Sequence, residues 1–363
     1  MSWLLAFLGF ALLIILHELG HFTAAKAVGM RVERFALFFP PLLGKVRRGE
    51  TEYAIGAIPL GGYVRITGMN PTEEIPPEVA HRAYYRQPVW KRIVVIGAGP
   101  AVNIVLAFVI LTAYLQIQGT PDYRVTSQVE ALATDSAAAG VLRPGDRVVA
   151  VDGVRGGPER LREQVSTHTC AGTPEEGCLA TSAALVTVER GGREQSFRIT
   201  PVYSEASKRP LLGFTYGTER FFTPVGGIDD AVTDSADYLW FVTTTTVDRL
   251  AGVFTSAEKR KEISGVVGSY EATRQSFELS TDRAILLLAV ISLSLGVINL
   301  FPFLPLDGGH IFWALAEKVR GRAIPFSVME RSGFIGFALV IALFVIGLTN
   351  DIGRLTGEGF QVR

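Results

Sequence analysis

Charged residues are scarce in this sequence of 363 residues. Lys, Arg, Asp and Glu make up 19% of the chain, whereas soluble domains average about 25%. The 35 basic and 35 acidic residues cancel, so no excess of positive charge indicates a nucleic-acid partner. Hydrophobic residues make up 48%. The composition therefore argues against an ordinary soluble protein and favours a membrane protein.

Cysteine is also scarce, because the chain contains only Cys170 and Cys178. Two thiols cannot supply a structural zinc site made of four cysteines. Both lie in a segment that the loop charges place outside the cytoplasm, where an oxidising environment favours disulfides. We expect a disulfide that closes the short loop between them, and two free thiols are the alternative.

Long apolar runs, by contrast, are present four times. A membrane-spanning helix needs about 20 such residues. Buried core helices are the alternative for each run. A cleaved signal peptide is the alternative for residues 2–16, but this stretch has no basic start and no small-residue cleavage site. We predict four transmembrane helices. The runs cover 3–25, 93–115, 284–306 and 333–349.

The cations between these runs orient the helices by the positive-inside rule. Ten Lys and Arg residues lie in 30–92, and Lys318, Arg320, Arg322 and Arg331 follow the third run. Both loops should therefore be cytoplasmic. The two termini and residues 119–283 should lie on the outer side.

The first run contains a metal-binding motif, His17-Glu18-Leu19-Gly20-His21. Helical residues i and i+4 lie about 40° apart, so both imidazoles project from one face. Zinc hydrolases with this spacing use two imidazole ligands and an adjacent carboxylate that acts as general base on water. A soluble helix of this kind has a polar outer face, which is missing here. We predict zinc hydrolysis inside the bilayer, nearer its cytoplasmic side, with Glu18 as the base.

A catalytic zinc site needs a third protein ligand and an open position for water. The third run ends in Asn299-Leu-Phe-Pro-Phe-Leu-Pro-Leu-Asp-Gly-Gly-His310. Pro302 and Pro305 should unwind the helix, which membrane depth tolerates where the backbone is buried in protein or lines a wet cavity. Asp307 ends this stretch at the depth expected for His17, so we assign it as the third ligand. An ordinary turn is the alternative, since Leu-Asp-Gly-Gly also suits one.

These motifs resemble those of the site-2 protease family of intramembrane zinc metalloproteases, in its bacterial branch with one extracytoplasmic PDZ-like domain. The resemblance implies one Zn²⁺ ion bound by His17, His21 and Asp307, with Glu18 as catalytic base, in a bacterial inner membrane. It rests on the two motifs above, on Gly97-Ala98-Gly99-Pro100 with Asn103, and on Ile58 to Val64. One departure is Val266 within 263–268, where relatives often carry proline.

The resemblance also implies the substrates and the residues that contact them. The substrates would be single-pass membrane proteins already shortened on the outer side, such as anti-sigma factors or remnant signal peptides. Asn299 would contact the substrate backbone. The remaining substrate-binding candidates are Pro302, Gly61, Gly62 and Tyr63. Membrane lipid is the other expected partner, and no nucleic acid is expected.

Residues 50–68 alternate between polar and apolar side chains, which predicts strands with turns at Gly56 and at Gly61-Gly62. The exposed edge of such a strand could hold an unwound substrate through main-chain hydrogen bonds. A plain surface hairpin is the alternative.

The outer segment contains Ser136 to Gly153, which resembles the core of PDZ domains. We expect a small helix, a glycine turn and then a strand whose Val149 and Val151 share a face. A hairpin over 185–199 should close this domain. Such a domain either receives a peptide or filters substrates by size, and we favour the filter. Residues 229–254 predict a helix.

The predicted fold is therefore a polytopic α-helical membrane protein with four transmembrane helices, a membrane-associated β-hairpin and an inserted PDZ-like α+β domain. A metal transporter and a non-enzymatic PDZ scaffold are the alternative functions. A transporter has no need of Glu18 beside the ligands, and a scaffold would not need His17 and His21. The predicted segments are 1–29, 30–92, 93–118, 119–203, 204–283, 284–312, 313–332, 333–350 and 351–363.

Overall fold

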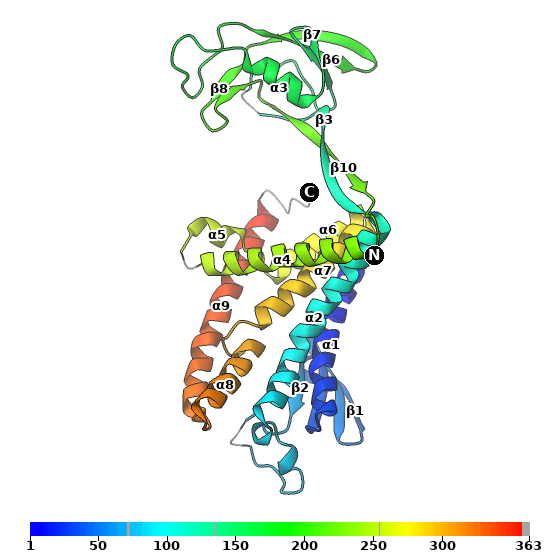
Figure 1. Ribbon diagram of the computed structural model, residues 1–363, viewed down its shortest axis with the longest axis vertical. Helices are drawn as coiled ribbons and strands as arrows, with labels where there is room; N and C mark the ends of the chain where they lie inside the picture. The colour runs from blue at the N-terminus through cyan, green and yellow to red at the C-terminus, as the bar shows by residue number, and fades with distance from the viewer. Residues whose placement is uncertain (71–72, 134–135, 254, 358–363) are drawn as a thin grey trace. The chain divides into compact units, whose positions relative to one another are not determined.

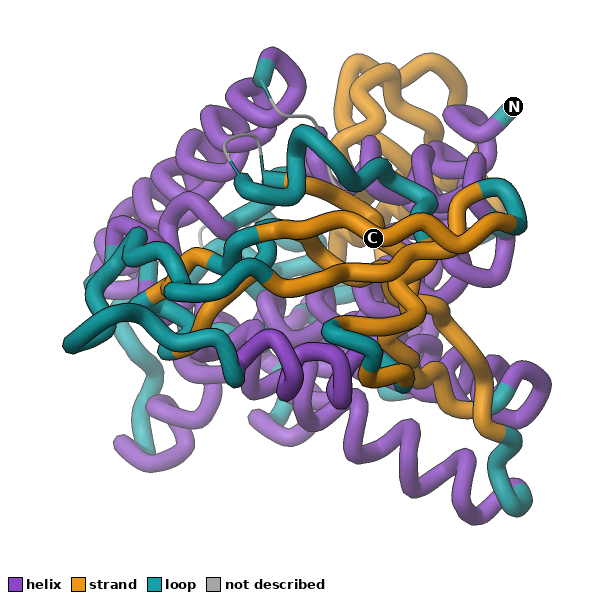
Figure 2. The backbone as a smooth tube through the Cα atoms, turned by 90° about the horizontal axis from the view of Figure 1, so that it is seen from above, coloured by secondary structure: helices purple, strands orange, loops and turns teal. Residues whose placement is uncertain are grey.

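The computed structural model describes residues 1–70, 73–133, 136–253 and 255–357 (Figure 1). The chain divides into two compact units. Unit 1 comprises Met1–Ile117 and Val225–Arg363, and unit 2 comprises Gln118–Pro224. Unit 1 is mostly helical, whereas unit 2 contains most of the strands, which are orange in Figure 2. The second unit is therefore an insertion in the chain of the first.

Four long helices dominate unit 1. In the described part of the chain, α1, α2, α7 and α9 are long and apolar enough to cross a membrane, which agrees with the four predicted spans. Within unit 1, helices α4, α5 and α6 lie between α2 and α7 in the sequence. The helices are α1 (Ser2–Ala27), α2 (Val89–Gln118), α4 (Ile228–Gly252), α5 (Ala257–Glu262), α6 (Val266–Leu279), α7 (Thr281–Asn299), α8 (Asp307–Arg320) and α9 (Phe326–Thr356).

The helices extend beyond the apolar runs that predicted them. Helix α2 begins at Val89 rather than residue 93, and α9 covers 326–356 rather than 333–350. Charged residues ended the predicted runs, but Lys, Arg and Glu are good helix formers, so the backbone ladder continues through them. The predicted tail 351–363 is helical up to Thr356, and residues 358–363 lie outside the described residues.

The predicted break in the third span is confirmed. Helix α7 ends at Asn299, residues 300–306 are not helical, and α8 begins at Asp307. The connector predicted over 313–332 includes the end of α8, which continues to Arg320. The buried residues of α8 are Gly308, Gly309 and Ala314, and its cations Lys318 and Arg320 lie in its last turn. The predicted helix 229–254 is confirmed as α4, and Phe254 lies outside the described residues.

Unit 1 also contains a sheet made of two long strands, β1 (Val32–Arg48) and β2 (Thr51–Ile66). Each of residues 34–37 is opposite two partners on β2. Phe35, for example, faces Tyr53 on one side and Val64 on the other. The segment 34–37 is therefore central in the sheet. Residues 62–66 have pairing partners on one side only among the described residues, which leaves them as an edge.

The turns predicted near Gly56 and Gly61-Gly62 agree with the strand pairing. Residues 52–55 and 62–65 pair on opposite sides of residues 34–37 and run in opposite directions, so the chain reverses between them. It also turns at Gly49-Glu50, and the range assigned to β2 includes all three glycines. A Cβ atom on Gly56 would overlap the carbonyl oxygens of Phe38 and Phe39. Glycine is needed there because two backbones approach closely.

Unit 2 is built around a six-stranded sheet with the order β10-β3-β4-β6-β7 and β5 beside β4. Its core is apolar and includes Leu142, Val148, Val186 and Ile199. The elements of this unit are β3 (Thr120–Leu132), β4 (Arg147–Val151), β5 (Val154–Arg155), α3 (Pro158–Ser166), β6 (Ala184–Arg190), β7 (Arg193–Ile199), β8 (Val202–Ser204), β9 (Arg209–Leu211) and β10 (Phe214–Thr223).

The hairpin predicted over 185–199 is confirmed as β6 and β7, but three details of unit 2 were predicted wrongly. Residues 136–141 form successive turns rather than a helix. The register of β4 shifts between Val148 and Ala150, so Val148 and Val151 share the core and Val149 is only half-buried. A bulge of this kind moves side chains to the other face.

The predicted boundary of unit 2 at residue 203 is also wrong. Residues 209–223, expected in a helical segment, form β9 and β10. Strand β10 pairs along β3 from Phe214↔Leu132 to Thr223↔Thr120. This long-range pairing leaves no local signal in the sequence of β10.

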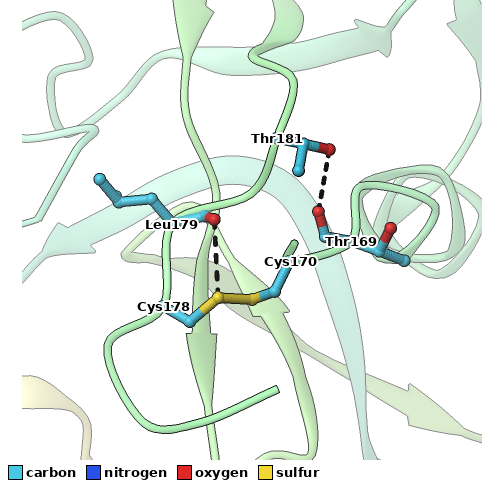
Figure 3. The surroundings of a disulfide bond; sticks show 5 residues. All are labelled: Thr169, Cys170, Cys178, Leu179 and Thr181. Carbon is cyan, nitrogen blue, oxygen red and sulfur yellow. Dashed lines mark hydrogen bonds between the residues drawn. A yellow bond between two sulfur atoms is a disulfide. The ribbon is translucent and has the colours of Figure 1, made fainter. Parts of the chain in front are cut away.

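The two cysteines are joined. Cys170 and Cys178 form a disulfide in unit 2, with their Cα atoms 6.2 Å apart (Figure 3). The hydroxyl of Thr181 donates a hydrogen bond to the carbonyl of Thr169 (3.1 Å) at the base of the same loop. The disulfide expected from the sequence is therefore present, and it closes a short loop.

Candidate metal centre

Helix α1 supplies two imidazoles to one buried point in unit 1. The residues His17 and His21 are only 8% and 7% exposed. Their Nε2 atoms lie 3.2 Å apart. The i, i+4 spacing brings both rings to the same face. Gly20 allows α1 and α2 to approach closely, because a Cβ there would lie 2.6 Å from the carbonyl oxygen of Ala98.

Helix α8 supplies the third group with its first residue. The Oδ2 atom of Asp307 lies 3.3 Å from Nε2 of His17 and 3.3 Å from Nε2 of His21. All three donor atoms lie within 4.8 Å of one another. The break at 300–306 is what turns the start of α8 towards α1, so the two prolines position the carboxylate indirectly.

The donor set fits a zinc ion. Tetrahedral ligands about 2.0–2.1 Å from zinc lie about 3.3 Å from each other, and the three donor atoms have this spacing. The buried Oδ2 of Asp307, one of the three converging atoms, has no hydrogen-bond partner. Buried polar atoms are normally paired, so a converging, unpaired donor is what a cation would satisfy. Two nitrogens and one carboxylate oxygen also match the ligands that zinc prefers.

A backbone carbonyl orients one of the ligands. Nδ1 of His21 lies 2.9 Å from the carbonyl oxygen of Val95 on α2, so Nδ1 donates there and Nε2 keeps its lone pair for a metal. Gly99 lies one turn further along α2, and a Cβ on it would overlap the imidazole of His21. The sequence alone predicted no role for Val95 or Gly99 at this site. The Gly97-x-Gly99 pair was the available signal for such a close approach.

Glu18 lies between the two imidazoles in the sequence and faces β2. A Cβ atom on Gly62 would lie 2.8 Å from its Cγ atom, so the sheet edge formed by residues 62–66 passes directly beside this carboxylate. Glu18 is half-buried. The structure therefore brings a carboxylate, three metal donors and a strand edge into one region.

The remaining predicted residues lie at the end of α7, in the break that follows it and on β2. Asn299 is the last residue of α7 and is half-buried, and Pro302 lies exposed in the break. Gly61 packs against the ring of Phe39. The ring of Tyr63 stacks on Phe39 at 6.2 Å, and its hydroxyl accepts a hydrogen bond from Arg34 (3.2 Å).

Residues 5–343 match the sequence profile of peptidase family M50. A protein from Rhizobium meliloti with the name "Putative zinc metalloprotease" is 31% identical over 369 residues, covering 95% of each chain. Proteins with the same name from Nostoc and Campylobacter jejuni are 28% and 26% identical, and the matches cover 98% and 92% of those chains. With its four apolar helices, this chain belongs to peptidase family M50, which confirms the resemblance in its sequence, and is an integral membrane zinc metalloprotease.

Proposed function

We propose that this protein hydrolyses peptide bonds within or near the transmembrane segments of single-pass membrane proteins. The convergence of His17, His21 and Asp307 from two separate helices carries this proposal. These residues would hold one zinc ion, which when bound polarises a water and the substrate carbonyl. Substrates already shortened on the outer side, such as anti-sigma factors or remnant signal peptides, are the proposed class.

The roles of the protein's own groups follow from their positions. Glu18, beside the ligands, would take the proton from the attacking water and return it to the leaving amine. The carbonyl of Val95 holds His21 in the tautomer that leaves Nε2 free. The half-buried site limits the access of bulk water.

The strand edge would hold the substrate. Helical substrates have their carbonyls bonded internally, so cleavage requires an unwound segment. Residues 62–66 have an unpaired side among the described residues and lie against Glu18. An extended substrate could add to this edge through main-chain hydrogen bonds. Gly62 and Tyr63 lie in the edge, Gly61 precedes it, and Asn299 and Pro302 are the other proposed substrate contacts.

The proposed orientation places the metal site towards the cytoplasm and unit 2, together with both termini, outside a bacterial inner membrane. The disulfide between Cys170 and Cys178 supports an oxidising location for unit 2. Unit 2 would form a PDZ-like domain that filters substrates by size rather than receiving a peptide.

The proposal is tested by metal analysis of the purified protein, combined with cleavage of a transmembrane substrate in detergent or proteoliposomes. We expect one zinc per chain and cleavage by the wild type. Glu18→Gln should retain the zinc and lose cleavage by at least about a hundredfold, because a general base contributes 10²–10⁴ in rate.

Three outcomes would reject parts of the proposal. Cleavage by Glu18→Gln at the wild-type rate would reject the assigned base. Zinc flux without cleavage would favour a transporter. Unchanged function after alanine replacement of His17 and His21 would favour a scaffold.

A further inference from the structure

A partly buried ion pair joins α2 to α8, the helix that begins with Asp307. The guanidinium of Arg92 donates two hydrogen bonds to the carboxylate of Glu317, at 2.9 Å and 2.7 Å. Arg92 is only 7% exposed and also lies over the ring of Tyr84. The pair is therefore two-pronged and buried on the arginine side, whereas the Glu317 side chain is 27% exposed.

Helix α8 needs such an attachment because its link to α7 is irregular. Residues 300–306 are not helical, so α7 does not set the direction of α8. Glu317 lies ten residues after Asp307, which is about 15 Å along the helix. A tilt of about 4° around Glu317 would move Asp307 by about 1 Å, whereas ligand distances in a metal site are defined to about 0.2 Å.

The same face of α2 also contacts His21. Arg92, Val95 and Gly99 are spaced by three and four residues, so they lie on one side of the helix, and all three are buried. Val95 accepts the hydrogen bond from His21, and Gly99 leaves room for its ring. One helix face therefore contacts one ligand directly and a second ligand through α8.

We propose that Arg92 and Glu317 are positioning residues for the metal centre, and that their ion pair holds Asp307 in place against His17 and His21. This inference rests on the proposed metal site. It predicts that breaking the ion pair weakens zinc binding even though neither residue touches the metal donors.

The test measures zinc affinity of the full chain by competition with a chelator, together with the visible absorption spectrum of the cobalt-substituted protein. Arg92→Gln and Glu317→Gln should each weaken zinc binding by about 10–100-fold, as for other outer partners of metal ligands, and should alter the cobalt spectrum. Arg92→Lys keeps the positive charge but loses the planar guanidinium that donates two hydrogen bonds. Its zinc affinity should lie between those of the glutamine variants and the wild type. The exchanged pair, Arg92→Glu with Glu317→Arg, should recover zinc affinity.

Arg82→Gln is the matched control. Arg82 also donates two hydrogen bonds to one carboxylate, that of Glu50 (2.7 and 2.8 Å), but it lies outside the ligand-bearing helices. The Arg82→Gln variant should have lower stability and unchanged zinc affinity.

Wild-type affinity in Arg92→Gln and Glu317→Gln would overturn the inference, as would an equal loss in Arg82→Gln. If Arg92→Gln fails to fold, Arg92→Lys and the exchanged pair decide in the same way. Failure of the wild type to bind zinc would instead reject the metal site itself.

Discussion

Unit 1 and unit 2 each contain a buried histidine beside an aspartate, and the two sites differ in how their polar atoms are satisfied. In unit 2, Nε2 of His168 lies 2.7 Å from Oδ2 of Asp152, and Nδ1 lies 2.8 Å from the hydroxyl of Ser182. The other oxygen of Asp152 accepts a hydrogen bond from the backbone of Leu185 (2.8 Å). Every polar atom of that imidazole has a protein partner.

In unit 1 the donors converge without being satisfied. Nε2 of His17, Nε2 of His21 and Oδ2 of Asp307 approach one point, and the buried Oδ2 has no hydrogen-bond partner. Burial of polar groups is stable when they are paired and costly when they are not. The unit 2 cluster, whose polar atoms are paired by protein groups, is therefore structural. The unit 1 cluster, whose metal-binding atoms converge without such partners, is suited to a cation.

The largest expected difference is in zinc binding. Asp307→Asn should lose stoichiometric zinc and cleavage, because a charged ligand becomes a weak neutral donor. Asp152→Asn should retain both. Metal analysis of the two purified variants measures this. Loss of zinc in Asp152→Asn alone would reverse the assignment of the two sites.

Removal of zinc should affect the two units differently. Chelation should abolish cleavage and expose α1 and α8 to hydrogen exchange near the site, and added zinc should reverse both effects. Protection of unit 2 should not change, because its imidazole is satisfied by protein groups. Equal loss of protection in both units would contradict this separation.

Replacement of His168 should lower the stability of unit 2 rather than change zinc binding. His168→Ala removes the hydrogen bond between His168 and the carboxylate of Asp152, which should lower the stability of unit 2 by about 1–3 kcal/mol. Hydrogen exchange of β4 and β6 in the full chain would show this loss. Zinc content is the control and should equal that of the wild type.

Removal of the disulfide should also lower the stability of unit 2, and this change involves no titratable group. Cys170→Ser with Cys178→Ser should lower the stability of unit 2 by about 2.5 kcal/mol, the value expected for closing a loop of about nine residues. Zinc binding should again be unaffected. A smaller loss in reducing buffer for this variant than for the wild type would show that the disulfide is the cause.

Acid should produce the smallest effect. Burial opposes ionisation of Asp152, but the hydrogen bonds from Leu185 and His168 outweigh it and hold the pKa of this carboxyl below its usual value. Its contribution to stability is therefore complete above the unfolded pKa of about 3.9 and is lost as the pH falls through the lower folded value. Asp152→Asn should flatten the stability of unit 2 against pH below about 4. An unchanged acid slope would show that another carboxyl is responsible.

The sequence predicted the features that depend on the pattern of neighbouring residues. The apolar runs indicated four long helices, the i, i+4 spacing placed His17 and His21 on one face, and Pro302 with Pro305 indicated the break before α8. These features depend on helix period and on the backbone chemistry of proline, both of which are readable from neighbouring residues.

Contacts between distant segments were not readable in the same way. The strand register of β1 and β2, the pairing of β10 with β3 and the ion pair of Arg92 with Glu317 each join residues far apart in the chain. A lone arginine at the start of an apolar run, such as Arg92, could have been recognised as needing a partner, but the sequence does not name it.

The sequence by itself determined the helices, the ligand types and the spacing of the two imidazoles, because side-chain chemistry and helix period are local properties. Only the tertiary structure decided that Asp307 meets them, that Gly62 brings a strand edge beside Glu18, and that α2 holds α8 in position. These contacts depend on how separate helices and strands pack against one another, and that packing is set by the whole chain rather than by any short segment of it.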